Sequence, residues 1–585
     1  MVRRRQKKEK KFAFSRLTFF NSIISLFIFL IIFRLFFLQV VEHNFYEALA
    51  SGQHEIYKEL VPIRGQIYAQ DKTGELYPIA QNRDVYFLYA VPIELEKPVD
   101  DTVGKLAEKF AWDDEDKIYF TEKFSQENDP YEPVKKGLTL EDKTEIESWQ
   151  IKGLYFTPHP SRYYPNENIG SHIIGFYSFK ADQPMGQYGL EGYFEDELAG
   201  VRGAIQSERD AAGRLITVAP QSVSLAEDGM DIVLTVDNVI QHTACKTLDE
   251  YVARLGAKGG SVVVMEPDSG KILALCGSPD FDPNQYYNQD DILAYNNPAI
   301  AFEYEPGSIF KPITLAAGLD LGVITPDSTY YDEGCMRVEG WYKPICNSDV
   351  AQYPQGHGLQ TMTNILELSL NTGAMTVAEK VSSKLLKEYI EAFGFGRLTN
   401  ISLTGEADGN ISNLDKGSVY TYTASFGQGM TVTPLQMAAA YGAIANGGKL
   451  MKPYIVEEKR YSDGRTERNE PVELQKVISP QVSTLLSGML VSVIENGHAT
   501  RAGVPGYYLA GKTGTAQVPS PSGGYSDETI HSFVGFGPIE DPKFVVMVRL
   551  DNPGVNFSAS SAAPLFGEVA KFILDYYQIP PLHWK

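Results

Sequence analysis

A serine and a lysine three residues apart form the first pattern in the sequence that could carry out chemistry. Ser308 and Lys311 lie in the stretch YEPGSIFK, and Pro312 is tolerated only in a first helical turn, so a helix should begin close to Ser308. One turn places the lysine amine and the serine hydroxyl on the same face. Burial would lower the pKa of the lysine and let it take the serine proton, while backbone N–H groups at the helix start suit an oxyanion. The pattern indicates a nucleophile with its base; an ordinary helix start is the alternative.

A second short pattern is Ser369-Leu370-Asn371, in a segment whose apolar periodicity predicts a helix over residues 366–381. Ser369 could pass a proton between Lys311 and a leaving amine, and Asn371 could hydrogen-bond a substrate amide. Taken alone, the triplet is equally typical of a Ser/Asn pair that caps a helix.

A third pattern is Lys512-Thr513-Gly514-Thr515. A strand carrying Lys512 would bring a second cation to the site, which would lower the pKa of Lys311 and attract a substrate carboxylate. Gly514 would let a peptide backbone approach closely, and the hydroxyls of Thr513 and Thr515 can bind a carboxylate. The alternative is an edge strand followed by a turn.

Residues 506–513 also fit the phosphate-binding pattern G-x-x-x-x-G-K-[ST]. That loop must open a helix whose N-terminus faces the phosphates. The residues after Thr513 are GTAQVPSPSGG, and their prolines and glycines forbid a helix. The interior of the loop is also bulky and apolar. We therefore reject a nucleotide site.

The elements around these patterns predict an α+β fold. Short strands are expected at residues 232–236, 261–265, 271–276, 531–537 and 544–550, and helices at residues 239–255, 366–381, 434–445 and 563–577. Strands at both ends with helices between them predict an antiparallel sheet faced by helices, with the Ser308 helix in the middle.

The length and the net charge of the chain limit the number of domains and the kinds of partner that can be expected. A chain of 585 residues is too long for one core, and a formal net charge of −22 argues against nucleic-acid binding. Residues 42–227 hold no nucleophile and base at useful spacing, so they are interpreted as a pedestal or dimerisation-like domain, and residues 228–585 as the catalytic domain. No Cys/His grouping has metal-ligand spacing, and no cofactor is expected.

The N-terminus predicts a membrane anchor. Residues 1–16 form a basic tail, and residues 17–41 are apolar over a length that can span a bilayer. No small-residue cleavage site follows, so an uncleaved single-pass helix is expected in the cell (cytoplasmic) membrane, with the tail in the cytoplasm and the rest outside. Arg34 near the outer end is expected to snorkel to the interface, the alternative being a contact with another membrane helix.

The four cysteines predict one disulfide. Cys335 and Cys346 lie close together in a Gly- and Pro-containing stretch and could close a small loop in an exported chain. Cys245 and Cys276 lie in a helix-like and a strand-like apolar setting, so buried free thiols are expected there.

The three patterns in this order are a known signature of penicillin-binding proteins and class A β-lactamases. The chain resembles a class B (monofunctional) penicillin-binding protein over nearly its whole length. Further similar segments are Arg64-Gly65, residues 189–192 (GLEG), 278–284 (SPDFDPN), 425–429 (SFGQG), 433–436 (TPLQ) and 532–536 (SFVGF). The chain looks more like the division-septum type than the elongation type.

The resemblance implies peptidoglycan D,D-transpeptidation through an acyl-enzyme on Ser308, and covalent inhibition by β-lactams. It implies that Lys311 is the base, that Ser369 and Lys512 carry a proton to the leaving group, and that Asn371 holds the peptide. Thr513 and Thr515 would hold its carboxylate, and the N–H groups of Ser308 and Thr515 would form an oxyanion hole. It also implies a SEDS-family glycan polymerase as partner, with a possible interaction role for Arg34 and the Arg64 segment.

Two other classes of protein are alternatives. A β-lactam hydrolase or D,D-carboxypeptidase would need a water-activating group, and Glu406 with Asn410 fits the Glu-x-x-x-Asn spacing of class A β-lactamases. A membrane anchor and a long N-terminal region are foreign to that family. A β-lactam sensor would need an intracellular signalling domain, for which the tail is too short, and an inactive scaffold would be expected to lose a motif residue.

Overall fold

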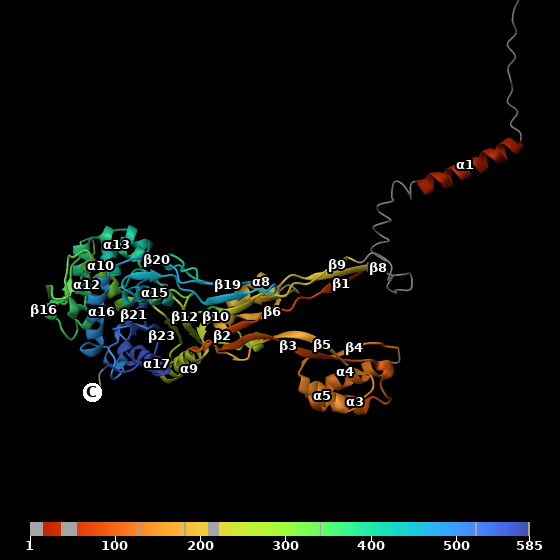
Figure 1. Ribbon diagram of the computed structural model, residues 1–585, viewed down its shortest axis with the longest axis horizontal. Coiled ribbons are helices and arrows are strands. Elements are labelled where there is room, and N and C mark those ends of the chain that lie inside the picture. Colours follow the sequence, from red (N-terminus) through yellow and green to blue (C-terminus); the bar gives the residue numbers. More distant parts are fainter. Residues whose placement is uncertain are drawn as a thin grey trace, which may run out of the picture. The chain divides into compact units, whose positions relative to one another are not determined.

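The computed structural model describes residues 16–36, 55–126, 128–180, 183–208, 222–339, 341–520 and 523–582 (Figure 1). The chain divides into two compact units. One is Met1–Pro62 with Val201–Glu227, and the other is Ile63–Gly200 with Asp228–Lys585. The chain returns to the larger unit at Asp228, the residue at which the expected catalytic domain begins.

The smaller unit contains helix α1 (Arg16–Phe36) and an antiparallel sheet of β1 (Glu55–Leu60), β8 (Gly203–Glu208) and β9 (Ser222–Ser224). Helix α1 overlaps the predicted anchor, whose residues 37–41 lie outside the described residues, as do residues 1–15 of the basic tail. In the part of the chain that the structure describes, no helix is both long and apolar enough to cross a membrane.

The larger unit is built on a five-stranded sheet with every neighbouring pair antiparallel. Its order is β12 (Ile272–Ser278), β11 (Gly259–Met265), β23 (Phe544–Asp551), β22 (Tyr525–Gly537) and β21 (Ala510–Pro519). Strands β11 and β12 are buried along their whole length, as uninterrupted apolar runs predict for strands covered on both faces. The predicted antiparallel sheet, which joins an early hairpin to strands near the C-terminus, is confirmed.

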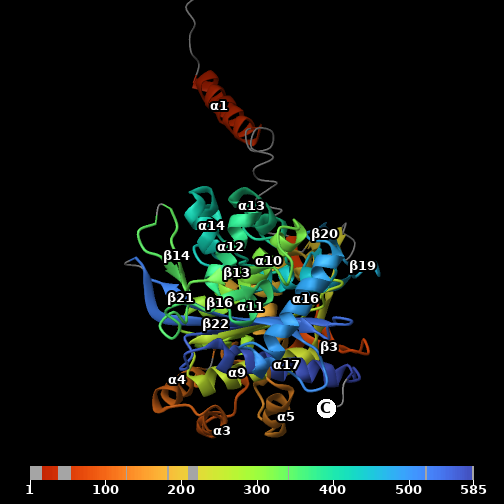
Figure 2. The same cartoon turned by 90° about the vertical axis from the view of Figure 1, so that its left-hand side faces the viewer.

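Helices cover both faces of this sheet. Figure 2 shows α9 and α17 on one face and α10, α11 and α16 on the other. Helix α15, buried at all but its last residue, also packs on β11, β22 and β23. The bounds of the helices in this part are α9 (Asn238–Leu255), α10 (Lys311–Asp320), α11 (Met362–Glu367), α12 (Asn371–Val381), α13 (Ser383–Ala392), α14 (Ser418–Ala424), α15 (Pro434–Ala445), α16 (Pro480–Glu495) and α17 (Ala562–Tyr576).

A seven-stranded sheet joins strands from residues 67–163 to strands from the catalytic part of the chain. Its order is β19 (Thr466–Arg468), β18 (Val456–Arg460), β10 (Asp231–Asp237), β2 (Ile67–Gln70), β3 (Leu76–Ala90) and β4 (Glu132–Leu138), with β5 (Leu154–Tyr163) also paired to β3. Strands β2 and β10 run parallel, with Ile67 opposite Ile232. The two regions assigned to separate domains therefore share one sheet.

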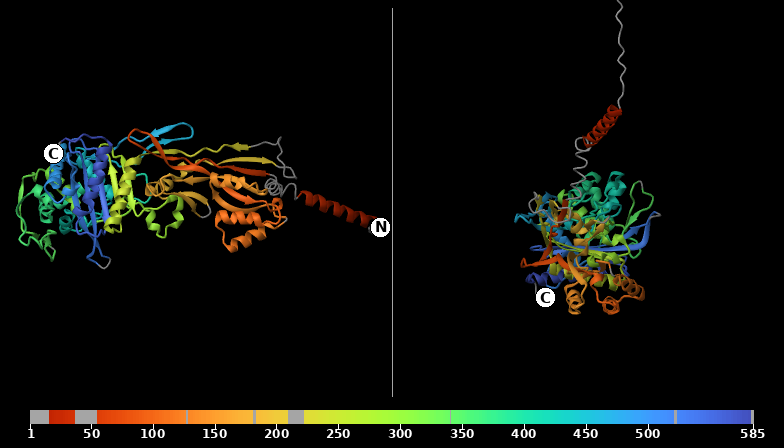
Figure 3. Two further views of the ribbon diagram at one scale, coloured as in Figure 1. Left: turned by 90° about the horizontal axis from the view of Figure 1, so that it is seen from below. Right: turned by 90° about the vertical axis from the view of Figure 1, so that its right-hand side faces the viewer.

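Three helices form a small lobe on strands β3 to β5. The charged, helix-periodic region near residues 91–150 forms α3 (Asp100–Phe110), α4 (Asp114–Phe124) and α5 (Leu140–Ser148). Their apolar sides enclose a separate core with Leu88, Leu106 and Phe124 at its centre. Figure 3 shows these orange helices on one side of the neighbouring strands.

Short elements complete the larger unit. The two-stranded pairs in the described residues are β6 (Phe176–Lys180) with β7 (Gln183–Gln187), β13 (Thr329–Asp332) with β16 (Gly358–Thr361), β14 (Cys335–Met336) with β15 (Ile345–Cys346), and β17 (Lys449–Met451) with β20 (Glu473–Lys476). The short helices are α6 (Ser171–Ile174), α7 (Gly189–Tyr193) and α8 (Glu195–Ala199).

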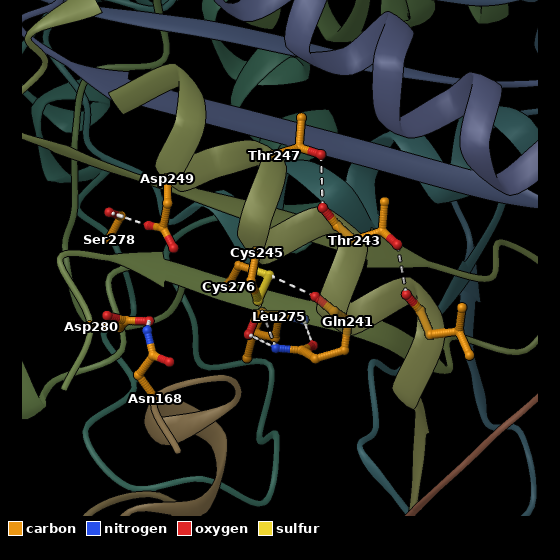
Figure 4. Close-up of a disulfide and its surroundings, with 11 residues drawn as sticks. Asn168, Gln241, Thr243, Cys245, Thr247, Asp249, Leu275, Cys276, Ser278 and Asp280 are labelled. Carbon is orange, nitrogen blue, oxygen red and sulfur yellow. Dashed lines mark hydrogen bonds between the residues drawn. A yellow bond between two sulfur atoms is a disulfide. The ribbon is translucent and has the colours of Figure 1, made fainter. Parts of the chain in front are cut away.

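Both pairs of cysteines are bonded. Cys335 and Cys346 form a disulfide across β14 and β15, where they are direct register partners. The expectation of free thiols at Cys245 and Cys276 is wrong, since they form a second disulfide between α9 and β12 (Figure 4). Helix α9 packs directly on β12 and brings the two Cα atoms to 5.2 Å, within the range a disulfide requires.

A buried ion cluster ties the Arg64-Gly65 segment to residues 189–195. Arg64 donates to the carboxylates of Glu191 and Glu195, and Arg162 Nε donates to Glu191 Oε1 at 2.7 Å. Glu191 is fully buried. Burial alone would raise the pKa of Glu191, but the charges of Arg162 and Arg64 hold it below its usual value. Arg64 is only 8% exposed, so its guanidinium serves an internal, structural role within this cluster.

Replacing Glu191 with glutamine should destabilise the protein, because it leaves two buried guanidinium groups without their shared counter-charge. We expect the free energy of unfolding, measured by urea denaturation, to fall by about 3–5 kcal/mol. The matched variant Glu147→Gln removes an exposed ion pair with Lys143 and should change it by less than about 0.5 kcal/mol. An unchanged unfolding curve for Glu191→Gln would contradict the role assigned to the cluster.

Candidate active site

Ser308 lies in a tight turn that immediately precedes a helix. Residues Gly307–Phe310 form a 3-10 turn, and α10 begins at Lys311 with Pro312 in its first turn. The predicted helix start is thus resolved into two pieces, with the nucleophile in the 3-10 turn and the lysine at the start of the α-helix. Ser308 is partly exposed, whereas Gly307 and Ile309 on either side are buried. The turn therefore holds the serine at the surface of a packed core.

Close backbone packing fixes this turn. Gly307 has φ +58°, and its N–H donates to Gly427 O at 2.9 Å. A Cβ on Gly427 would lie 2.2 Å from Gly307 O, which explains the glycine in the Ser425–Gly429 loop. Below the turn, the buried Tyr441 hydroxyl donates to Ile309 O at 2.7 Å. The nucleophile is therefore held by contacts to its backbone on two sides.

Lys311 reaches Ser369. It is completely buried, and its Nζ donates to Ser369 O and to Ser369 Oγ, the latter at 3.3 Å. Ser369 has φ +61° and separates α11 from α12, so the single helix predicted over residues 366–381 is wrong. The left-handed residue interrupts the helix at the point where both its carbonyl and its hydroxyl meet the lysine amine.

Lys512 reaches the same hydroxyl from the opposite wall. Its Nζ donates to Ser369 Oγ at 2.9 Å and to Thr513 O at 3.1 Å. Ser369 Oγ therefore lies between the two lysine amines, on the path proposed for a proton. Among the described residues, no hydrogen bond joins Ser308 Oγ to Lys311 Nζ.

Burial suppresses the charge of both lysines. It lowers the pKa of Lys512 to about 7. Burial also lowers the pKa of Lys311 well below its usual value, with a further decrease from the charge of Lys512 and only a partial offset from Asp349. Burial is the larger cause, so the apolar wall of α10 does more than the second lysine to leave Lys311 neutral and able to accept a proton.

Asn371 begins α12 on the wall opposite β21. Its Nδ2 donates to Cys346 O at 3.0 Å, so one amide hydrogen is engaged by the chain. In the part of the chain that the structure describes, the other hydrogen and the carbonyl oxygen of the amide have no protein hydrogen-bond partner. The side chain is held by β15 while retaining the groups that a substrate amide would need.

Strand β21 places the remaining motif residues. Gly514 lies against the nucleophile segment, since a Cβ there would be 2.9 Å from Pro306 O and 2.5 Å from Ser532 Oγ. The glycine is thus required by close packing within the protein, in addition to any approach of substrate. Thr513 Oγ1 lies 3.4 Å from Lys512 Nζ.

Thr515 has a partner that the sequence did not reveal. Its Oγ1 donates to Ser558 Oγ at 3.1 Å and accepts from Ser558 N at 3.2 Å. Ser558 is buried and lies in the short turn after β23. To donate to a carboxylate, as the resemblance implies, the Thr515 hydroxyl must give up its bond to Ser558.

Glu305 is a second residue that sequence reasoning missed. Its carboxylate accepts from Gly429 N and from Tyr525 Oη, both at 2.9 Å. It thereby links the nucleophile segment to the Ser425–Gly429 loop and to the β21–β22 hairpin. Its position three residues before Ser308 was the only available signal.

The structure also places the residues of the hydrolase alternative and of the rejected nucleotide site. The Glu406 carboxylate accepts hydrogen bonds from Thr399 and Asn400, and among the described residues it forms none with Ser308, Lys311 or Lys512. The Glu406 carboxylate thus stabilises the loop that contains Thr399 and Asn400. Lys512 and Thr513 lie inside strand β21, with no helix after them, which is incompatible with a phosphate-binding loop.

Family comparison agrees with this geometry. Residues 260–571 match the model of the penicillin binding protein transpeptidase domain, and residues 59–234 match that of the penicillin-binding protein dimerisation domain. The chain belongs to the penicillin-binding protein transpeptidase family.

Individual relatives cover most of the chain. Stage V sporulation protein D of Bacillus subtilis is 33% identical, over 96% of this chain and 86% of its own length. Peptidoglycan D,D-transpeptidase FtsI of Escherichia coli is 29% identical, over 74% of this chain and 71% of its own length. The solved structure of penicillin-binding protein 2X from Streptococcus thermophilus has a TM-score of 0.75 at 23% identity, over 89% of this chain and 80% of its own.

The lowered lysine pKa values predict how reactivity at Ser308 depends on pH. As the pH falls through 7, Lys512 gains a proton, and the pair loses its ability to accept one from Ser308. The rate constant for acylation by benzylpenicillin should therefore fall below pH 7, by up to about tenfold per pH unit, and level off above pH 8. Stopped-flow competition between benzylpenicillin and a fluorescent penicillin checks this, with the thermal midpoint followed in parallel. A flat profile from pH 5.5 to 8 would contradict the assignment.

Proposed function

We propose that this chain is a peptidoglycan D,D-transpeptidase that cross-links stem peptides through an acyl-enzyme on Ser308. The observation that carries this proposal is the position of Ser369 Oγ between Lys311 Nζ and Lys512 Nζ, at 3.3 and 2.9 Å. One hydroxyl between two buried amines can relay a proton in either direction, as a two-step acyl transfer requires.

Acylation begins when Ser308 Oγ attacks the carbonyl carbon of the D-Ala-D-Ala bond. Neutral Lys311 takes the serine proton, and the N–H groups of Ser308 and Thr515 stabilise the oxyanion. The proton then passes through Ser369, with Lys512 beside it, to the nitrogen of the terminal D-Ala. The C–N bond breaks, D-Ala leaves as an amine, and an ester to Ser308 remains.

Transfer runs along the same path in reverse. The amine of a second stem peptide attacks the ester carbonyl and loses a proton to the Ser369–lysine pair. That proton returns to Ser308 Oγ as the ester bond breaks and the new amide cross-link forms. Asn371 would hold the donor peptide through its amide, and Thr513 and Thr515 its terminal carboxylate.

The same chemistry predicts covalent inhibition by β-lactams. Attack on the lactam carbonyl opens the ring, and the leaving nitrogen stays tethered to the acyl group. The solved structure of penicillin-binding protein 3 from Mycobacterium tuberculosis, in complex with aztreonam, has a TM-score of 0.68 at 24% identity and covers 90% of this chain and all of its own. A hydrolase is the less favoured alternative, because Glu406 is occupied by a structural loop.

We further propose that the protein is anchored in the cell membrane through residues 17–41 and acts in septal wall synthesis with a SEDS-family polymerase. The apolar run that includes α1, the preceding basic residues and the relatives named FtsI support this role. An elongation-type role is the alternative. Copurification of the full-length chain with a SEDS polymerase from detergent extracts tests the partnership, and its absence would count against it.

Ser308→Ala should abolish labelling by fluorescent penicillin without changing the thermal midpoint, because it removes one partly exposed hydroxyl. Mass spectrometry of the wild-type protein should find the penicilloyl adduct on Ser308, with a lifetime of minutes or longer. The control variant Ser558→Ala removes a serine hydroxyl that bonds to Thr515 and is not the nucleophile, so it should retain labelling. Labelling of Ser308→Ala would overturn the nucleophile assignment, and rapid release of penicilloic acid would favour the hydrolase.

The anchor and the septal role share one experiment. A fluorescent fusion of the full-length chain should sediment with membranes and gather at division septa in growing cells. Replacing Ile28 and Leu30 by lysine should release it, because each charge costs about 2.5–3.5 kcal/mol at the centre of a membrane helix. Valine at both positions is the matched control. Membrane association of the lysine variant would refute the anchor, and a signal along the lateral wall would favour elongation.

A further inference from the structure

The chain between β13 and β16 is arranged around a buried carboxylate. Residues 333–357 leave β13 after Asp332, form the β14–β15 pair and return to β16. This segment contains Cys346, whose carbonyl accepts the Asn371 amide at 3.0 Å. The position of that carbonyl therefore decides how the Asn371 amide is oriented.

Asp332 is completely buried and collects hydrogen bonds from four residues. Its carboxylate accepts from Thr372 Oγ1 at 2.7 Å, from Asn347 Nδ2 at 2.9 and 3.0 Å, from His357 N at 2.9 Å and from Gly334 N at 3.1 Å. Among the described residues, no lysine or arginine forms a salt bridge with it. Its charge is stabilised by oriented dipoles alone, including the first turn of α12.

Asn347 completes a closed network with the helix that carries Asn371. Asn347 Oδ1 accepts from Thr372 N at 3.1 Å and lies 3.2 Å from Thr372 Oγ1. Asp332 thus binds the residue that follows each partner of the Asn371–Cys346 hydrogen bond. Thr372 follows Asn371, and Asn347 follows Cys346. Because these two residues are the immediate neighbours of the Asn371–Cys346 hydrogen bond, fixing them fixes the geometry of that bond.

We infer that Asp332 is a positioning residue that orients the Asn371 amide toward the donor amide through Asn347, Thr372 and the Cys346 carbonyl. This inference rests on the proposed function, since it assigns Asn371 to the amide of the bound substrate. Within the described residues, Asp332 forms no hydrogen bond with Ser308, Lys311, Ser369, Asn371 or Lys512. A slight shift of Asn347 and Thr372 would misdirect the Asn371 amide while leaving Ser308, Lys311 and Lys512 in place.

The two ways of reading Asp332, as a positioning group and as a fold determinant, differ in which ligands they affect. Benzylpenicillin carries a side-chain amide for Asn371 to bind, and 6-aminopenicillanic acid has the same ring without that amide. A positioning role requires a selective loss with benzylpenicillin. A structural role alone would lower acylation by both compounds equally.

The test compares acylation rate constants of the full-length protein with both compounds. Asp332→Asn keeps the size of the side chain. It also replaces one accepting oxygen by an amide NH₂ group, which faces the N–H and O–H groups that now donate to Asp332. We expect acylation by benzylpenicillin to fall at least about tenfold, and that by 6-aminopenicillanic acid to fall far less. In an Asn371→Ala background, Asp332→Asn should change the benzylpenicillin rate by no more than about twofold, since the group it positions is gone.

Two further variants keep the outcome decisive. Asp320→Asn alters another carboxylate, which accepts from Tyr389 Oη and Ser479 N, and should leave both rates within about twofold. Thr372→Val removes one donor to Asp332 with little change in shape, and it decides the question should Asp332→Asn not fold. Equal losses for both compounds, no loss, or full additivity with Asn371→Ala would overturn the inference. Failure of the wild-type protein to react with either compound would instead overturn the proposed function.

Discussion

Burial of two lysine amines around one serine hydroxyl is the constraint on which the catalytic part depends. Lys311 and Lys512 are both almost completely inaccessible, and both donate to Ser369 Oγ. Two ammonium groups this close together in an apolar setting repel each other, and the charge of Asp349 offsets only part of the effect on Lys311. Burial therefore favours the neutral forms of both amines, with the pKa of Lys512 lowered to about 7 and that of Lys311 well below its usual value, which is costly for folding near neutral pH and useful for catalysis. The surrounding sheet and helices must be rigid enough to keep both amines from reaching solvent.

That rigidity comes from elements that are distant in the sequence. Strand β21 brings Lys512 against the turn of Ser308, where Gly514 and Gly307 permit close approach of the two backbones. The early hairpin β11–β12 pairs with β23 and encloses the core beneath α15. The third wall is different, because α12 and Asn371 are supported by a segment with little regular structure. A single buried carboxylate there holds the segment in place, whereas continuous backbone pairing with β22 supports Lys512 on β21.

Sequence patterns were sufficient for the three motifs, the antiparallel sheet and most helix positions, because apolar periodicity and Gly/Pro punctuation are local signals. They failed where the outcome depends on tertiary packing. The left-handed Ser369 is invisible to periodicity, since the apolar spacing of α11 and α12 continues across it. In the sequence, Cys245 and Cys276 are two separate apolar positions, and only the packing of α9 on β12 brings them together. Ser558 comes close to Thr515 only after the last sheet strand is in place.

The parallel pairing of β10 with β2 has a consequence for how the chain can be divided. A fragment that starts at residue 228 would keep every motif residue but lose β2, the neighbour of β10 on one side. The open backbone groups of β10 would then be free to recruit a strand from another molecule, which is the usual origin of edge-to-edge aggregation. Residues 67–70 therefore protect the edge of β10, and the solubility of a separate catalytic fragment depends on keeping them.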